Sequence, residues 1–313
     1  MWSSTYSLTV VISRFVENWN KYYCSAPAGD SAGGHIAAAL SIRWRREVLE
    51  KQQRAAGAGG KDASEGEGPL PPILAQVLVY PVLQLVNTTT SSHLVNLDPI
   101  YRRRNSARLV RLLAFPGRQQ DGALLDAISA GNHTTRATRE RLAPYFHFGP
   151  VDGSEDEASF LITLVVNTIL LKSVSEFYVF KISIFSRMSI EQVDMLVTNE
   201  QRELAARIRE AGEHPEGDPK LEAELLPRLL ELEVSPLFID SFDNVPNTYV
   251  VTADFDVLRD DSLLFVRRLR ASGRVQVAHK HYPLYAHGFM NMAVPGVVQR
   301  DFAAFLQKNP HFF

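Results

Sequence analysis

The sequence predicts an α/β fold in which a mostly parallel sheet carries helices on both faces. Three observations predict it. A glycine-rich turn at 29–34 leads into an alanine-rich helical stretch, residues 73–81 form a continuous aliphatic run, and strands alternate with helices from 247 to 306. Continuous aliphatic runs are typical of strands buried on both faces, and strand–helix alternation gives parallel strands joined by right-handed crossovers. With 313 residues, the chain can hold one large domain or two smaller ones.

The turn Gly29-Asp30-Ser31-Ala32-Gly33-Gly34 is the most informative stretch. Its G-x-S-x-G pattern is typical of a nucleophile elbow, in which a serine at a sharp strand-to-helix corner exposes its hydroxyl. Such a corner needs a left-handed backbone at the serine and small neighbours, so we expect side chains at Gly29 and Gly33 to clash. The alternative is a glycine-rich loop with an incidental serine. The extended GDSAGG form, followed by alanines, favours the elbow.

The remaining elements follow from hydrophobic patterning. We expect a short strand within 22–26 before the turn, and a helix from Ala32 to about Gln53 whose aliphatic face carries Ile36, Leu40, Trp44 and Val48. Residues 55–68 are rich in glycine and predict a flexible linker. Further strands are expected at 73–81, 247–253 and 275–279, and further helices at 102–113, 136–142, 188–233 (two helices), 263–269 and 297–306.

We divide the chain into three parts. Residues 1–86 form the N-terminal part of the core, 87–234 a cap or insertion, and 235–313 the C-terminal part of the core. Within the insertion, 160–186 is unusually apolar, and its first run of 12 residues is too short to span a bilayer. It is a buried helix or strand, a membrane-dipping cap segment, or a translated insertion foreign to the fold.

Composition and charge exclude several classes of function. The net charge of −2 gives no basic excess for a nucleic-acid partner. Cys24 is the single cysteine, so no intramolecular disulfide forms, and the apolar run 8–12 is shorter than a membrane span. His279 and His281 are the one close pair among nine histidines, with no carboxylate or third histidine nearby in sequence. We expect neither a metal nor a cofactor.

A serine nucleophile needs a base to take its proton and an acid to orient that base. The strand at 247–253 is followed by Asp256, which we favour as the acid. Asp254 lies two residues earlier and could point the same way. Asp260 and Asp261 compete as well, but they are expected to open the next helix, where carboxylates stabilise the N-terminus.

His287 is the favoured base. It lies in a loop before Gly288, after the strand at 275–279 and a loop that contains Pro283. A histidine in a loop followed by glycine suits a mobile base above the nucleophile. His279 and His281 lie on the strand itself, so we expect them to be structural.

The blocks 29–34, 256–261 and 287–289 together resemble the hormone-sensitive-lipase branch of the α/β-hydrolases, especially the group of arylacetamide deacetylases and neutral cholesterol ester hydrolases. Supporting matches are Val79-Tyr80-Pro81, Ser235-Pro236-Leu237 and 265–270. The resemblance covers 29–85 and 235–306 and implies an α/β-hydrolase fold with a helical cap insertion. It implies Ser31 as the nucleophile, Asp256 as the acid, His287 as the base and the backbone N–H of Ala32 as an oxyanion donor.

The same resemblance implies a location in the endoplasmic reticulum, as a membrane-anchored protein with a lumenal domain. It implies hydrolysis of carboxylic esters or acetyl amides of small lipophilic substrates, at a possible membrane surface. The sequence lacks the family's His-Gly-Gly-Gly block, which supplies further oxyanion donors, and 28 residues precede Gly29. We therefore expect the first strands of the fold to be missing. The alternative function is a truncated, catalytically inactive relative that acts by binding or folds only in part.

Overall fold

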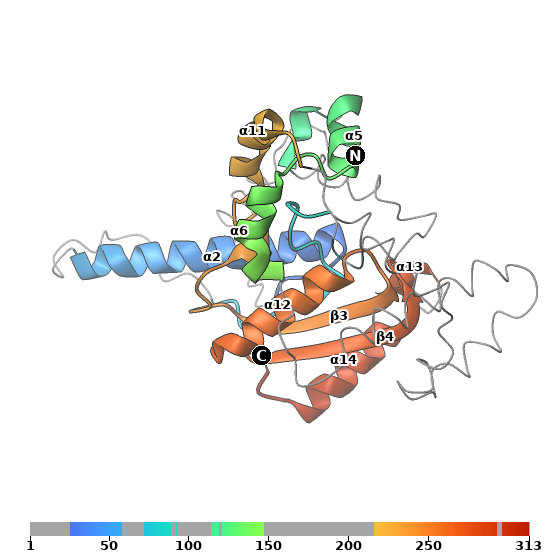
Figure 1. Ribbon diagram of the computed structural model, residues 1–313. Coiled ribbons are helices and arrows are strands. Elements are labelled where there is room, and N and C mark those ends of the chain that lie inside the picture. The colour runs from blue at the N-terminus through green and yellow to red at the C-terminus, as the bar shows by residue number, and fades with distance from the viewer. Residues whose placement is uncertain are drawn as a thin grey trace, which may run out of the picture.

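The structure is a computed structural model that describes residues 26–57, 72–88, 90, 92, 114–118, 121–146, 216–292 and 296–312. Several expected segments lie outside these ranges: most of the strand at 22–26, most of the linker, the helix at 102–113, the apolar stretch 160–186 and the first helix of 188–233. Figure 1 shows the described part as a sheet with helices packed around it.

The sheet has four parallel strands in the order β1-β2-β3-β4, which confirms the predicted α/β fold with a parallel sheet. The strands are β1 (Ala28–Asp30), β2 (Ala75–Val79), β3 (Asn247–Phe255) and β4 (Val277–Ala286). Leu78 of β2 lies opposite Gly29 on one side and Val250 on the other. Because parallel strands end at the same edge, the residues after β1, β2, β3 and β4 gather there.

Helices cover both faces of this sheet (Figure 1). Side chains alternate along a strand, so Leu78 and Val250 face one side while Val79 and Val251 face the other. The first face packs on α2 (Ala32–Gly57) and α12 (Arg259–Ser272). The second face packs on α14 (Val297–Lys308), whose Phe302 and Phe305 rings lie against Tyr249 of β3.

Helix α2 approaches the sheet through alanines. Ala37 and Ala38 belong to the cluster under Leu78, and such small side chains let the helix lie close to the strands. Leu40 and Trp44 are buried as predicted, in a separate cluster with Ile73. Ile36, expected on the same face, is 36% exposed, because the turn nearest the sheet is occupied by the alanines instead. The helix continues to Gly57, four residues past the predicted end.

A second group of helices lies to one side of the sheet: α5 (Gly122–Ser129), α6 (Arg136–Phe146) and α11 (Pro219–Leu229) (Figure 1). Asp121 and Asp218 cap α5 and α11, each accepting from backbone N–H groups of the first turn. The apolar side chains of this group form one cluster with Val257 and Leu258, which follow β3. The short helices η2 (Pro116–Arg118), η3 (Pro236–Phe238) and α13 (Phe289–Met292) complete the described elements.

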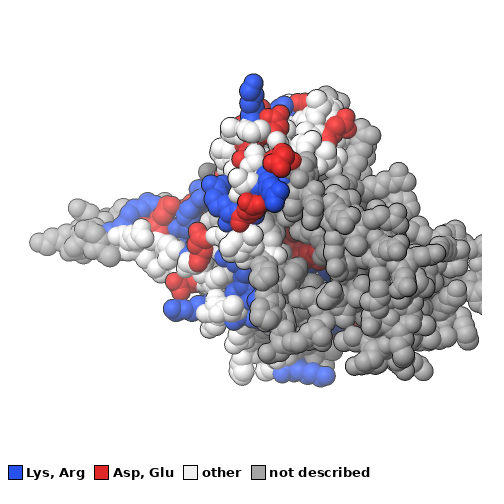
Figure 2. Space-filling model, in the orientation of Figure 1, with Lys and Arg blue, Asp and Glu red and all other residues white. Residues whose placement is uncertain are grey.

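Charges of both signs are interspersed on the face shown in Figure 2, over α2 and the α5–α6–α11 group. Ion pairs such as Arg43–Glu47 at 2.8 Å and Arg54–Glu50 at 3.4 Å line α2. Surface pairs of this kind contribute about 0–1 kcal/mol each, so they add little to the stability of the helix. Within the described ranges, no helix is both long and apolar enough to cross a membrane.

His35 and His133 are packed inside the protein, and His279 is partly buried. His35 of α2 is fully buried and lies 3.0 Å from the carbonyl oxygen of Val82 through Nδ1. His133 lies between α5 and α6 and is also fully buried. His279 lies on β4. Burial lowers the pKa of each of the three to about 4.

These histidines predict that the protein loses stability in mild acid. The unfolded chain protonates them near pH ~6.5 while the folded chain holds them neutral to about pH 4, so the free energy of unfolding falls as pH decreases through that window. The loss is up to about 3 kcal/mol for each of the two fully buried imidazoles, His35 and His133. Urea unfolding midpoints measured from about pH 7 to about pH 4.5 check this. His35→Asn should reduce the slope, and His311→Asn, at an exposed site, should not. Equal slopes in His35→Asn and wild type would contradict the prediction.

Candidate active site

Ser31 occupies a sharp corner between β1 and α2, as the G-x-S-x-G pattern predicts. β1 ends at Asp30, α2 begins at Ala32, and the serine between them has a φ of 55°. Its N–H donates to the carbonyl oxygen of Val79 at 2.9 Å, and its own carbonyl oxygen accepts from the N–H of His35 at 3.1 Å. The backbone therefore passes from sheet to helix within one left-handed residue.

The glycines around Ser31 have different roles. A Cβ on Gly29 would lie 2.3 Å from the backbone carbon and oxygen of Gly33, closer than any real contact. A Cβ on Gly34 would lie 3.0 Å from Cβ of Pro81. The expectation of a clash at Gly33 is wrong, because a Cβ there meets no atom of the described residues within 4 Å. Gly33 is the second residue of α2.

His287 connects Ser31 with Asp256. Ser31 Oγ lies 2.8 Å from His287 Nε2, and His287 Nδ1 lies 2.9 Å from Asp256 Oδ1. The carboxylate accepts from Nδ1–H, which leaves Nε2 as the acceptor for the serine hydroxyl. His287 is 1% exposed and Asp256 is fully buried. The three side chains follow β1, β3 and β4, and the fold brings them together at the shared carboxyl edge of the sheet.

The loop after β3 holds Asp256 in place. The N–H of Leu258 donates to Asp256 Oδ1 at 2.8 Å, and the carbonyl oxygen of Asp256 accepts from the N–H of Arg259 at 3.2 Å. The same carboxylate oxygen thus accepts hydrogen bonds from the N–H of Leu258 in the loop and from Nδ1–H of His287. This fixed oxygen orients the imidazole by holding its Nδ1–H.

β4, the strand that precedes His287, is longer than expected. The predicted loop at Pro283 is instead part of β4, which runs from Val277 to Ala286. Its register against β3 shifts between the pairs Ala253↔Tyr282 and Phe255↔Ala286, so β4 carries extra residues there. Proline lacks the N–H that a regular ladder needs, and it is tolerated at such irregular positions. Gly288, with a φ of 80°, then turns the chain directly after the histidine.

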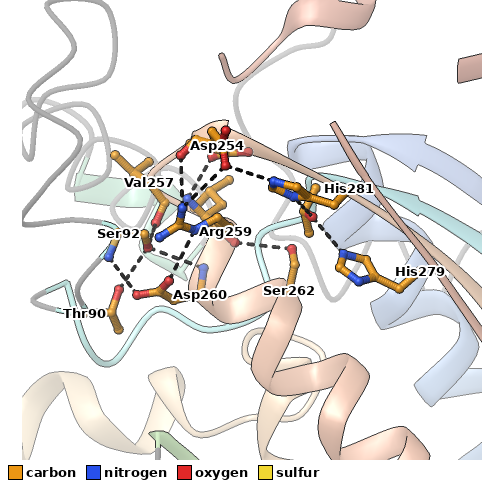
Figure 3. Close-up of polar contacts among 12 residues, drawn as sticks. Thr90, Ser92, Asp254, Val257, Arg259, Asp260, Ser262, His279 and His281 are labelled. Carbon is orange, nitrogen blue, oxygen red and sulfur yellow. Dashed lines mark hydrogen bonds and ion pairs between the residues drawn. The ribbon is translucent and has the colours of Figure 1, made fainter. Parts of the chain in front are cut away.

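The competing carboxylates have other partners. Asp254 Oδ1 lies 2.9 Å from Nε2 of His281, and Asp260 Oδ2 accepts from the N–H of Ser92 at 2.7 Å (Figure 3). Asp261 Oδ1 accepts from the side-chain amide of Gln84 at 3.0 Å. Asp256 is the carboxylate hydrogen-bonded to His287 in this structure.

Asp260 and Asp261 lie in the first turn of α12, as expected, but both are buried. Burial raises the pKa of Asp261 well above its usual value, and the charges of Asp260 and Asp256 add to this shift. The expectation that both aspartates open this helix is confirmed, and their burial is what the sequence did not indicate.

His279 and His281 share one hydroxyl on the same face of β4. His279 Nε2 and His281 Nδ1 lie 2.8 and 2.9 Å from Thr252 Oγ1, and His281 continues to Asp254 (Figure 3). Thr252 is fully buried. Across the described residues, no group of three or more His, Cys, Asp or Glu side chains is placed to hold a metal ion. The pair belongs to a polar chain across β3 and β4.

Ala32 and Asp30 are the two direct neighbours of Ser31 in the turn. Ala32 is the first residue of α2, so its N–H is among those that a helix N-terminus leaves without an intrahelical acceptor. Asp30 ends β1 beside Ser31. Sequence reasoning did not single out Tyr80, whose ring centroid lies 4.8 Å from that of His287. The sequence feature that could have indicated Tyr80 is the stretch Val79-Tyr80-Pro81, which matches the family.

The chain is similar in sequence to known proteins. A family model described as the alpha/beta hydrolase fold matches residues 19–144 and 224–291, which include Ser31, Asp256 and His287. Arylacetamide deacetylase from Bos taurus is 46% identical over 68 residues, 21% of this chain and 17% of that protein. Neutral cholesterol ester hydrolase 1 from Bos taurus is 24% identical over 265 residues, 84% of this chain and 48% of that protein.

Among solved structures, a hyperthermophilic esterase from Pyrobaculum calidifontis superposes with a TM-score of 0.38 and 17% identity, over 97% of this chain and 58% of that one. The chain spans about half or less of the length of these curated relatives. Their names are those to which the sequence motifs pointed, so the resemblance is confirmed.

Proposed function

Because the chain belongs to the family with the α/β-hydrolase fold, we propose that it is a serine hydrolase that cleaves carboxylic esters. The observation that carries this proposal is the continuous relay from Ser31 Oγ to His287 at 2.8 Å and from His287 to Asp256 at 2.9 Å. A serine hydroxyl is a poor nucleophile by itself. It becomes a good one when an imidazole takes its proton and a carboxylate orients that imidazole.

The reaction proceeds by acyl transfer. Ser31 Oγ attacks the ester carbonyl carbon while His287 Nε2 takes the hydroxyl proton, and Asp256 stabilises the resulting imidazolium through Nδ1–H. The tetrahedral intermediate collapses, His287 returns the proton to the leaving alcohol, and an acyl group stays on Ser31. A water molecule, deprotonated by His287, then releases the carboxylic acid.

The oxyanion of each tetrahedral intermediate needs donors. The N–H of Ala32 is one, because it lies directly after the nucleophile at the start of α2. Removing a single donor of this kind lowers the rate by about 10²–10³-fold in a hydrolase.

The substrates of this chain are proposed to be small lipophilic esters or acetyl amides. The names of the two curated relatives support this, since one is called arylacetamide deacetylase and the other neutral cholesterol ester hydrolase 1. The apolar stretch 160–186 in the sequence suits such a substrate. A location at the endoplasmic reticulum and contact with a membrane surface stay predictions of the resemblance.

The proposal is tested with the purified chain and p-nitrophenyl acetate, p-nitrophenyl butyrate and an acetanilide. Ser31→Ala should abolish turnover of every substrate that the wild type cleaves. Ser41→Ala is the matched control, because Ser41 lies on α2, the helix that follows Ser31, and its hydroxyl donates to the carbonyl oxygen of Ala37 at 3.0 Å. A fluorophosphonate should label Ser31 in the wild type, as read by mass spectrometry.

Equal trace rates in the wild type and both variants would contradict the proposal. They would favour the other reading, in which the chain is an inactive relative that acts by binding. Labelling of another serine with Ser31 unmodified would also count against it.

A further inference from the structure

Tyr80 directly follows β2 in the same way that Ser31 directly follows β1. Both residues have positive φ, 35° for Tyr80 and 55° for Ser31. Each donates its N–H to the neighbouring strand, Tyr80 to the carbonyl oxygen of Val251 at 2.8 Å and Ser31 to that of Val79 at 2.9 Å. A bulky residue with positive φ is strained, and before a proline such as Pro81 an extended backbone is preferred. Backbone strain of this kind gathers at functional sites.

The strained turn places the Tyr80 ring against His287. The two ring centroids lie 4.8 Å apart with an interplanar angle of 55°, and the Tyr80 ring also meets Phe289 edge-on at 5.6 Å. Tyr80 is fully buried and His287 is 1% exposed, so water is excluded from the contact between the two rings. The imidazole is thereby held by Asp256 along its plane and by an aromatic ring beside it.

The ring also matters electrostatically. A positive charge within ~6 Å of an aromatic centroid is attracted by the electron-rich face, and the attraction is strongest where water is excluded. His287 gains such a charge whenever it takes the proton of Ser31. Burial raises the pKa of Tyr80, and the charge of Asp30 adds to this, so the phenol stays neutral throughout.

We propose that Tyr80 is a positioning residue for the base: its ring fixes the His287 imidazole in line with Ser31 and stabilises the imidazolium formed during catalysis. The proposal rests on the hydrolase function proposed above. It assigns a role to the ring rather than to the hydroxyl, and to a residue that touches His287 and not the substrate.

The experiment compares Tyr80→Leu with Tyr80→Phe. Leu keeps a Cβ at the same strained φ and removes the ring, whereas Phe keeps the ring. Tyr80→Leu should lower kcat about tenfold with KM nearly unchanged, and it should move the acid limb of the kcat/KM profile to lower pH, because the imidazolium loses its aromatic neighbour. Tyr80→Phe should follow the wild type in both measurements.

Tyr249→Leu is the matched control. Tyr249 is a buried tyrosine on β3 whose ring packs on Phe302 and Phe305 of α14. The substitution Tyr249→Leu removes a core ring of the same size, and it should leave the acid limb of the kcat/KM profile at the same pH. The proposal is overturned if Tyr249→Leu moves the limb equally, if Tyr80→Leu leaves it unmoved, or if Tyr80→Phe matches Tyr80→Leu.

A second measurement needs no turnover. In the Ser31→Ala background, imidazole NMR gives the pH midpoint at which His287 protonates, with and without Tyr80→Leu. The midpoint should fall when the ring is removed, and an unchanged midpoint overturns the proposal. If the chain hydrolyses no ester, this comparison still decides the role of Tyr80, so failure of the proposed function is distinguishable from failure of this inference.

Discussion

Asp256→Asn is expected to lower kcat for p-nitrophenyl butyrate by about 10⁴-fold, the loss seen when the acid of such a triad becomes an amide. The Asp256 carboxylate accepts Nδ1–H of His287 at 2.9 Å and the N–H of Leu258 at 2.8 Å through the same oxygen. An amide that turns its NH₂ toward His287 forces the proton onto Nε2. The base can then no longer accept from Ser31. Steady-state kinetics check the loss, and a melting curve shows that the fold persists.

Asp254→Asn serves as the control for that variant. Asp254 lies two residues earlier and accepts from Nε2 of His281 at 2.9 Å, which an amide oxygen also can do. Its kcat should stay close to that of the wild type. An equal loss of kcat in both variants would show that Asp256 is not the only carboxylate that supports His287.

Gly29→Ala is expected to reduce the free energy of unfolding by about 3 kcal/mol and to abolish activity, since forced overpacking has costs of this order. The new Cβ would lie 2.3 Å from the backbone of Gly33, and backbone atoms cannot swing aside as a flexible side chain does. Relief requires β1 and α2 to separate, which displaces Ser31. Urea unfolding measures the first effect and ester hydrolysis the second.

Gly33→Ala is the matched variant on the other side of Ser31. Among the residues that the structure describes, none has an atom within 4 Å of a Cβ at Gly33, and alanine is favoured over glycine in a helix by about 1 kcal/mol. Stability should stay equal or rise. A destabilisation as large as that of Gly29→Ala would show that the turn needs both glycines.

Local patterns were sufficient to predict much of the site. The serine turn, the aspartate after the third strand and the histidine before a glycine are each encoded within a few residues, and the sequence places Ser31, Asp256 and His287 in the order that the fold requires. The parallel sheet was equally predictable, because buried strands of such a sheet have continuous aliphatic runs.

The sequence could not predict features that depend on distant neighbours. The packing of α2 is one example. It leaves room beside Gly33 among the described residues, and it brings alanines against the sheet so that Ile36 is exposed. The buried carboxylate of Asp261 accepts from the side chain of Gln84, which is 177 positions away. The contact between Tyr80 and His287 joins the ends of two different strands. The extension of β4 through Pro283 depends on a register shift that only its partner strand defines.

The apolar cluster that joins Val257 and Leu258 to the α5–α6–α11 group has a consequence for engineering the chain. Leu258 supplies the N–H that fixes the carboxylate of Asp256, so the anchor of the acid is itself built into the packing of those helices. Grafting the helices of a relative onto this sheet is therefore not a modular exchange. A graft that changes the volume presented by Leu124 or Leu225 alters the support beneath the triad even though it replaces no residue of it.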